Sequence, residues 1–250
     1  MAPILFITGG SRGIGAATAR LAARDGYDVA LTYVSDLAAA EAVAADVRAQ
    51  GRRALVIKAD TGEPADIARA FASVDEALGT LTAFFNNAGI IGPIAKLVDV
   101  PLDRLQRIVS VNTTGAYLAA QQAARRMSTR LGGKGGAIVN MSSIAAKLGG
   151  TNEATDYALS KGAIDTLTIG LAKELAGEGV RVNAVRPGLI YTDIHASTGQ
   201  PDRVDRYKHM VPMQRGGTAD EVAEAVLWLL SEKSSYCTGV LLDVAGGRGL

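Results

Sequence analysis

A tyrosine and a lysine lie four residues apart in the segment Tyr157-Ala158-Leu159-Ser160-Lys161. On a helix this spacing places both side chains on one face, with their Cβ atoms about 5–6 Å apart. A tyrosine hydroxyl ordinarily has a pKa of about 10, and a neighbouring cation stabilises its phenolate form. Such a pair can take a proton from an alcohol or give one to an alkoxide. The spacing alone is also compatible with a solvated surface pair.

Two hydroxyl groups precede this pair. Ser142 and Ser143 directly follow the apolar run 137–141, which has the character of a buried strand. In a doubly wound sheet, ligands bind at the carboxyl ends of the strands. A serine at such an end and the Tyr157/Lys161 face of the next helix therefore converge on one crevice, where the serine can donate to a substrate oxygen.

A glycine-rich turn, Thr8-Gly9-Gly10-Ser11-Arg12-Gly13-Ile14-Gly15, separates the first apolar run from a segment with helical spacing. Its pattern is Gly-x-x-x-Gly-x-Gly. Glycines at these positions let the backbone approach a pyrophosphate, which then lies on the N-terminus of the helix. By itself such a turn is often only a turn, but its place between a strand and a helix predicts a dinucleotide site.

These groups must be positioned by alternating elements. The expected strands are 4–7, 28–33, 54–57, 81–85, 137–141, 180–185 and 240–244, and the expected helices are 13–25, 37–50, 64–78, 113–131, 155–176 and 219–230. Strands joined by helices of this length need right-handed crossovers, which make the sheet parallel. We therefore expect an α/β fold with a doubly wound sheet and helices on both faces.

Composition excludes several classes of protein. Of 250 residues, 48% are hydrophobic, so a large core can form. The 26 basic and 25 acidic residues leave a net charge of +1, too small to attract nucleic acid or an anionic membrane. One cysteine and two histidines make a disulfide impossible within the chain and a metal site unexpected. No targeting signal or membrane span is visible, and a cytoplasmic location is expected.

The ordered motifs resemble those of the short-chain dehydrogenase/reductase family over essentially the whole chain. They are the glycine turn from Thr8 to Gly15, Asp60, Asn86-Asn87-Ala88-Gly89, Asn112, Ser143, Tyr157-x-x-x-Lys161, and Pro187-Gly188 followed by Thr192. The resemblance implies one Rossmann domain, residues 1–250, with a seven-stranded sheet and a nicotinamide cofactor. Ser143 lies one residue further from Tyr157 than in many members of the family, which predicts one extra residue within 149–156.

The resemblance also implies roles for individual residues. Tyr157 would transfer the proton, Lys161 would lower the Tyr157 pKa and hold the nicotinamide ribose, Ser143 would bind the substrate oxygen, and Asn112 would anchor a relay water. For Asn112, a helix cap or a buried polar bridge is the alternative. The implied cofactor contacts are Gly9, Ser11, Arg12, Gly13, Ile14, Gly15, Asp60, Thr61, Asn87, Ala88, Gly89, Tyr157, Lys161, Pro187, Gly188, Ile190 and Thr192. No metal is implied.

The second expected strand bears on the choice of cofactor. NAD-selective sites place an acid at the end of this strand, where it accepts from the ribose hydroxyls. Here the strand ends in Tyr33, and Asp36 falls at the start of the next helix, where the helix dipole alone favours an acid. Arg12 in the glycine turn can bind a 2′-phosphate. We therefore expect NADP(H), with NAD(H) as the alternative, and a contact from Asp60 to the adenine amino group.

The expected activity is oxidation of a small alcohol or reduction of a carbonyl compound, in the sugar/polyol dehydrogenase-like branch. The first alternative is a 3-oxoacyl-carrier-protein reductase, for which Arg125, Arg126 and Arg130 would dock the acidic carrier. Glu178 stands where that branch usually has a basic residue, which disfavours this alternative. The second is a nucleotide-binding sensor without turnover, which would not need Ser143, Tyr157 and Lys161.

Two further expectations concern the periphery. Residues 188–217 form a long irregular stretch with both histidines, His195 and His209, and we expect it to be a substrate lid. The helices 113–131 and 155–176 carry more apolar residues than one sheet-facing stripe requires, and the end of the chain, 240–250, is also apolar. Together with the resemblance, this surplus predicts a homotetramer with D₂ symmetry.

Overall fold

The computed structural model describes residues 2–250, and the side chains of all of these except 195–197. Within this range seven strands form one sheet in the order β3-β2-β1-β4-β5-β6-β7, and every neighbouring pair is parallel. The strands are β1 (Ile4–Ile7), β2 (Asp28–Tyr33), β3 (Ala54–Lys58), β4 (Ala83–Asn86), β5 (Gly136–Met141), β6 (Val180–Pro187) and β7 (Leu241–Val244). The expected parallel Rossmann fold is confirmed, and each strand lies within two residues of its predicted bounds.

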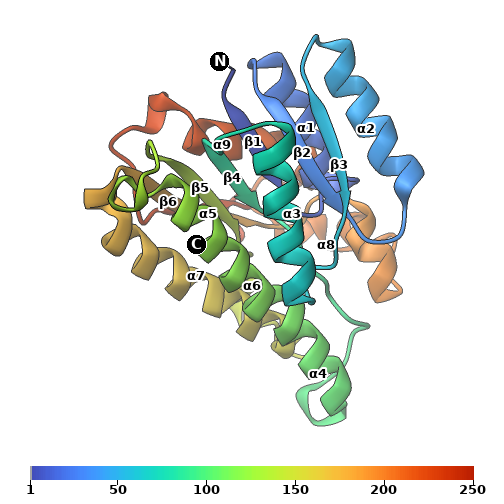
Figure 1. Ribbon diagram of the computed structural model, residues 1–250. Helices are drawn as coiled ribbons and strands as arrows, with labels where there is room; N and C mark the ends of the chain where they lie inside the picture. Colours follow the sequence, from blue (N-terminus) through green and yellow to red (C-terminus); the bar gives the residue numbers. More distant parts are fainter. Residues whose placement is uncertain (1) are drawn as a thin grey trace.

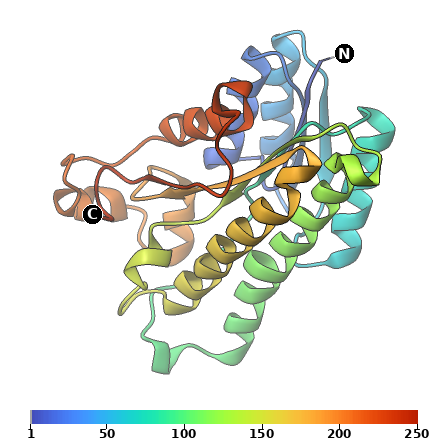
Figure 2. The same ribbon diagram turned by 90° about the vertical axis from the view of Figure 1, so that its left-hand side faces the viewer.

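Helices cover both faces of the sheet (Figures 1 and 2). The α-helices are α1 (Gly13–Arg24), α2 (Leu37–Ala49), α3 (Pro64–Ala77), α4 (Leu102–Val109), α5 (Ala116–Met127), α6 (Ala145–Leu148), α7 (Thr155–Leu175), α8 (Arg203–Tyr207) and α9 (Ala219–Leu230). One hydrophobic core joins α1, α2 and α9 to the sheet, and a second joins α3, α5 and α7 to its other face. Because successive side chains of a strand point to opposite faces, Leu5 and Ile7 enter the first core while Ile4 and Phe6 enter the second.

An aromatic cluster fills the second core beneath α3. The Phe6 and Phe71 rings meet edge to face with centroids 4.9 Å apart, and the Phe84 ring lies 5.6 Å from Phe6 and 5.3 Å from Phe71. All three side chains are fully buried. Because large aromatic side chains contribute most to core burial, this cluster anchors β1, β4 and α3 against one another at the centre of the sheet.

The prediction of a single helix over 113–131 is wrong. The helical segment begins earlier, with α4, passes through a π-helical turn at Ser110–Gly115, continues as α5 and closes with a 3-10 turn at Thr129–Leu131. The start of α4 is marked by Pro101 at the N-cap and Asp103 in the first turn, both typical of helix starts. α4 was not predicted, because half of the residues in the segment LDRLQRIV are polar and only Ile108 is buried.

The segment 188–217 is also more regular than expected. It contains a 3-10 helix at Asp193–Thr198, then α8, a second 3-10 turn at Lys208–Met210, and a β-bridge between Ile190 and Gly217 that closes its base. The side chain of His195 lies outside those that the structure describes, while that of His209 is exposed. None of the helices in the described part of the chain is long and apolar enough to cross a membrane.

Candidate active site

The glycine-rich turn joins β1 to α1 at the carboxyl edge of the sheet. Gly9 and Gly13 have φ values of +66° and +54°, in the left-handed region that favours glycine. A Cβ atom on Gly15 would overlap the Gly9 carbonyl oxygen, and one on Gly10 would lie 2.6 Å from the Leu31 Cβ atom. The turn is therefore a tight cradle at the start of a helix, with no room for a side chain at Gly10 or Gly15, and such a cradle fits a pyrophosphate.

Polar contacts from neighbouring strands hold this turn in place. The Thr32 hydroxyl of β2 accepts from the Gly9 N–H at 2.8 Å, and the Asn87 Nδ2 group after β4 donates to the carbonyls of Thr8 and Gly9, both at 2.8 Å. The Thr8 hydroxyl accepts from the N–H groups of Asn87 and Ala88. Asn87 and Ala88 thus lie against the glycine turn, as expected. Thr32 was not predicted, because a threonine within a strand does not by itself indicate such a contact.

Other predicted cofactor residues meet at the same edge. A Cβ atom on Gly13 would lie 3.5 Å from the Thr192 methyl group, so the segment after β6 reaches the glycine turn. Gly188 packs closely on Ala245, and Ile190 is buried. Pro187 is buried at the end of β6, Ser11 is partly exposed in the turn, and Ile14 packs on the α1 side of the sheet.

Asp60 lies just after β3, and its carboxylate already has partners within the protein. Its Oδ1 atom accepts from the Gly62 N–H at 2.8 Å, and its Oδ2 atom pairs with the Arg107 guanidinium at 2.6 Å. The neighbouring Thr61 is buried, and its carbonyl oxygen packs so closely on Gly115 that a side chain there would overlap it. A contact from Asp60 to adenine stays a prediction.

The side chains of Tyr157 and Lys161 lie together one turn apart on α7. The Lys161 ammonium nitrogen is 5.6 Å from the centre of the Tyr157 ring and donates to the Met141 carbonyl at 2.7 Å. Lys161 is 2% exposed. A Cβ atom on Gly89 would lie 3.3 Å from the Lys161 Nζ atom, so Gly89 lies directly against the lysine head group.

Burial opposes the charged forms of both groups. It raises the pKa of the Tyr157 hydroxyl, while a hydrogen bond with Ser143 lowers it. Burial lowers the pKa of Lys161 to about 8, and the Asp165 carboxylate acts in the opposite direction. Ser143, just after the end of β5, thus lies beside the tyrosine that shares one face of α7 with Lys161.

Asn112 lies in the π-helical turn and is almost fully buried. Its amide accepts from the Ile90 N–H and donates to the Ile90 carbonyl, both at 2.8 Å, and also donates to the Ser160 hydroxyl at 3.1 Å. The side chain therefore forms the buried polar bridge that was its alternative reading. Inserted π turns are frequent at functional sites, and the water-anchoring role of Asn112 stays a prediction.

The residues that bear on cofactor choice are arranged as the sequence suggested. Asp36 is the N-cap of α2, and its carboxylate accepts from the Ala39 N–H at 2.9 Å. Arg12 is exposed at the N-cap of α1, and its guanidinium donates no hydrogen bond to any other residue that the structure describes. The edge of the site beyond β2 thus carries two charged groups. The Arg12 guanidinium has no hydrogen-bond acceptor among the residues that the structure describes, and the Asp36 carboxylate already caps α2.

The basic cluster at the end of α5 is largely paired within the chain. The Arg126 guanidinium pairs with Asp75 at 2.7 Å and lies over the Phe71 ring, and Arg130 pairs with Glu178 at 2.7 Å. Glu178 also accepts from the Ser128 hydroxyl. These pairs use two of the three arginines to fasten α3 and the start of β6 to α5.

Comparisons with known proteins show which family the chain resembles. A family model described as enoyl-(acyl carrier protein) reductase matches residues 9–248. The oxidoreductase YgfF of Escherichia coli (strain K12) is 50% identical over 98% of this chain and 99% of its own. An L-rhamnose 1-dehydrogenase (NAD(P)(+)) of Sphingomonas sp. (strain SKA58) is 34% identical over 97% of this chain and 94% of its own.

A solved structure has the same fold throughout. The short chain dehydrogenase from Burkholderia cenocepacia J2315 in complex with NADP superposes with a TM-score of 0.91 at 36% identity, covering 99% of this chain and 98% of that one. Both the sequence matches and the fold extend over nearly the full length. The chain therefore belongs to the short-chain dehydrogenase/reductase family of oxidoreductases.

Proposed function

We propose that the protein interconverts a small alcohol and a ketone or aldehyde with a nicotinamide dinucleotide, NADP(H) in preference to NAD(H). The observation that carries this proposal is the buried Lys161 beside the Tyr157 ring, with Ser143 next to the tyrosine. The glycine cradle at the start of α1 supports the dinucleotide. A relative that binds NADP and another that oxidises rhamnose support the reaction class.

When bound, the nicotinamide cofactor would supply the hydride chemistry of this reaction. Tyr157 takes the hydroxyl proton during oxidation and returns it during reduction. The charged Lys161 favours the phenolate of Tyr157 and would hold the nicotinamide ribose. Ser143 donates to the substrate oxygen, and the segment Pro187-Gly188 would support the nicotinamide.

Consumption of NADPH with a panel of carbonyl compounds tests the proposal. The panel contains aldoses and their lactones, small ketones and aldehydes, and 3-oxoacyl thioesters. We expect turnover with at least one small carbonyl or, in reverse, with a sugar or polyol. Cofactor binding without turnover of any member would favour the nucleotide-sensor alternative instead.

The carrier-protein reductase remains the second candidate, and one observation weighs against it. Docking an acidic carrier requires free cations, but Arg126 and Arg130 are paired with Asp75 and Glu178. Turnover of a carrier-bound 3-oxoacyl group much faster than of its small thioester analogue would support this second candidate.

Selectivity provides a prediction for Arg12. We expect Arg12→Ala to weaken NADPH binding by about 1.5–3 kcal/mol, since a hydrogen bond to a charged group contributes about that much. NADH affinity should barely change, because NADH lacks the 2′-phosphate. Dissociation constants from fluorescence titration measure both effects. The matched control is Arg24→Ala, an exposed arginine at the other end of α1. Equal losses for the two cofactors would remove Arg12 from the phosphate site.

We further propose a homotetramer with D₂ symmetry, assembled partly through α5 and α7. These two helices lie side by side on the outside of the molecule (Figure 2). A groove between them is lined by Tyr117, Leu167 and Leu171, and Tyr117 is 53% exposed. Leu131, also in the groove, and Ile169 nearby on α7 add exposed apolar surface. Burying this surface against a second copy accounts for its composition.

The expected mass in light scattering is that of four chains. We expect Leu167→Glu to reduce it to two chains or one, because a carboxylate in an apolar contact loses its hydration. The control is Val98→Glu, since Val98 is 83% exposed and lies far from the groove lining. A parent protein with the mass of one chain at every concentration would contradict the assembly.

A further inference from the structure

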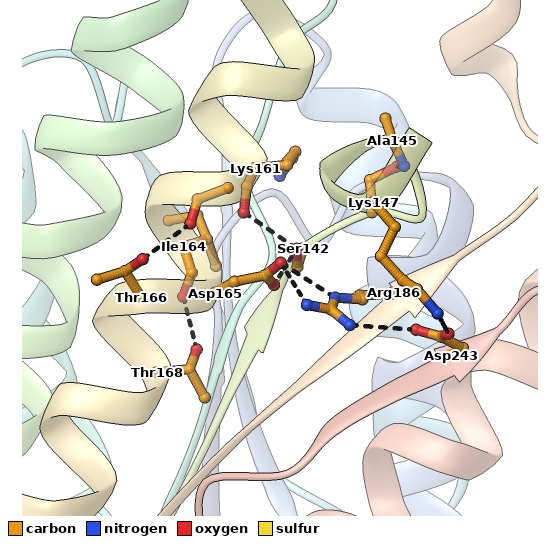
Figure 3. Close-up of polar contacts among 12 residues, drawn as sticks. Ser142, Ala145, Lys147, Lys161, Ile164, Asp165, Thr166, Thr168, Arg186 and Asp243 are labelled. Atoms are coloured by element: carbon orange, nitrogen blue, oxygen red, sulfur yellow. Dashed lines mark hydrogen bonds and ion pairs between the residues drawn. The ribbon is translucent and has the colours of Figure 1, made fainter. Parts of the chain in front are cut away.

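A chain of charged groups lies directly behind the catalytic lysine (Figure 3). One turn after Lys161 on α7, the Asp165 carboxylate binds the Arg186 guanidinium at 2.7 and 3.1 Å. Arg186 faces Asp243 at 3.6 Å, and Asp243 in turn pairs with Lys147 at 3.0 Å. None of these four residues has a place in the proposed reaction.

The carboxylate at the head of this chain is the most enclosed of the four. Asp165 is 8% exposed, and its other oxygen accepts from the Ser142 hydroxyl at 2.7 Å. The Ser142 hydroxyl also lies 3.2 Å from the Lys161 carbonyl. A buried carboxylate is costly unless it is both paired and hydrogen-bonded, and Asp165 satisfies both conditions.

Asp165 and its two partners, Ser142 and Arg186, lie on three segments of the active site. Ser142 directly precedes Ser143 at the end of β5, Lys161 lies four residues before Asp165 on α7, and Arg186 directly precedes Pro187 and the nicotinamide segment. One carboxylate therefore ties together the backbones that carry the catalytic serine, the catalytic lysine and the expected nicotinamide contact.

The charges in this chain also cancel. The two carboxylates of Asp165 and Asp243 balance the two cations of Arg186 and Lys147. The neighbouring α4 carries two further ion pairs, Arg104 with Asp156 at the start of α7 at 2.7 Å and Arg107 with Asp60 at 2.6 Å. The charged and titratable groups on α7, on α4 and in the chain behind Lys161 thus include Tyr157, Asp156, Arg104, Arg107, Asp60, Asp165, Arg186, Asp243 and Lys147.

We propose that Asp165 and Arg186 are a positioning pair for the catalytic centre, and that their opposite charges balance the electrostatic potential at the Lys161 ammonium group. This inference rests on the proposed proton transfer by Tyr157 and Lys161. It predicts that the two residues have opposite effects when their charges are removed singly, and little effect when both are removed together.

The signs follow from electrostatics. Asp165→Asn leaves Arg186 in excess, and the added positive potential favours deprotonation of the Tyr157/Lys161 pair. The acid limb of the pH profile for alcohol oxidation should then move to lower pH by about one unit, the size expected for one charge within a helical turn or two at moderate effective dielectric. Arg186→Gln leaves Asp165 in excess, and the same limb should move to higher pH by a similar amount.

The double variant Asp165→Asn/Arg186→Gln restores neutrality, so its acid limb should return close to the parent position. Arg186→Lys keeps the charge but loses the two-pronged hydrogen bond, so it should keep the pH profile while lowering kcat. The matched control is Asp28→Asn. Asp28 is equally buried and paired with Arg52 and Arg53, both at 2.7 Å, but lies at the amino end of β2, away from the site. The pH profile of the Asp28→Asn variant should match that of the parent.

A second measurement does not depend on turnover. NMR of cofactor-free protein with labelled tyrosine Cζ atoms follows the ionisation of Tyr157, whose signal is assigned by its loss in Tyr157→Phe. Opposite displacements of this titration in the two single variants support the inference even if no substrate has been found. Displacements in the same direction, or losses of activity with no displacement, would overturn it. A protein in which the displacements occur but no carbonyl is turned over would instead contradict the proposed function alone.

Discussion

Replacing Tyr157 by phenylalanine is expected to lower turnover by at least about 100-fold, because general acid–base catalysis contributes roughly 10²–10⁴ to a rate. The change removes one oxygen atom and keeps the ring beside Lys161, so the fold and the dinucleotide cradle should persist. Steady-state kinetics on the best substrate measure the loss, and a fluorescence titration checks that cofactor affinity is retained.

A matched hydroxyl deletion serves as the control. Tyr27→Phe removes the same atom from a partly buried tyrosine next to β2, at the amino end of the sheet. Its turnover should match the parent. If Tyr157→Phe kept near-normal turnover while folding correctly, another group would have to be the proton donor. The proposed role of Lys161, to favour the phenolate of Tyr157, would then also be contradicted.

The parts of the site that could be predicted from the sequence are those marked by a short and recognisable pattern of neighbouring residues. The spacing of Tyr157 and Lys161 fixes their common helix face, and the glycine turn is recognisable between a strand and a helix. The alternation of strands and helices determines the parallel sheet, and the parallel sheet brings the ends of β1, β4, β5 and β6 to one edge.

The residues that the sequence did not predict act through partners far along the chain. Thr32 supports Gly9 from a neighbouring strand, and Asp165 meets Arg186 across 21 positions of sequence. Neither residue type has a signature for such a contact, because threonine is ordinary in a strand and an aspartate on a helix is usually solvated. Their roles depend on strand order and helix packing, which only coordinates supply.

Buried amide groups near the site also bridge elements of the fold. The side chain of Asn112, whose role in the proton relay stays a prediction, forms hydrogen bonds with Ile90 and Ser160. Likewise, the Asn86 side chain donates to the side-chain amide oxygen of Asn140 at 3.0 Å and joins β4 to β5. Buried amides need such partners to offset their lost hydration. A polar residue near the site can therefore serve to hold the fold together through such hydrogen bonds.

Lys161→Met is expected to separate activity from stability. Turnover should fall by at least about 100-fold, because the variant loses the cation that favours the Tyr157 phenolate. The same substitution is expected to remove a cost to the stability of the folded protein. Burial lowers the pKa of Lys161 from 10.5 to about 8, so in neutral solution the folded protein holds a charged amine in an unfavourable environment. Methionine removes that cost, although it also leaves the Met141 carbonyl without its donor.

The pH dependence isolates the titration of Lys161 from the lost hydrogen bond. Between pH 8 and 10.5 the unfolded parent binds a proton that the folded parent has released, so the stability of the parent rises with pH relative to the variant. From pH 7 to about 9.5 the difference should change by about 2 kcal/mol in favour of the parent. Urea unfolding at one fixed protein concentration measures both proteins, and Lys161→Arg, which cannot lose its proton, should show no such gain. If the difference in the free energy of unfolding between the parent and Lys161→Met stayed constant with pH, Lys161 would have the same pKa in the folded and unfolded chain. Burial could then not be what adjusts the lysine for proton transfer.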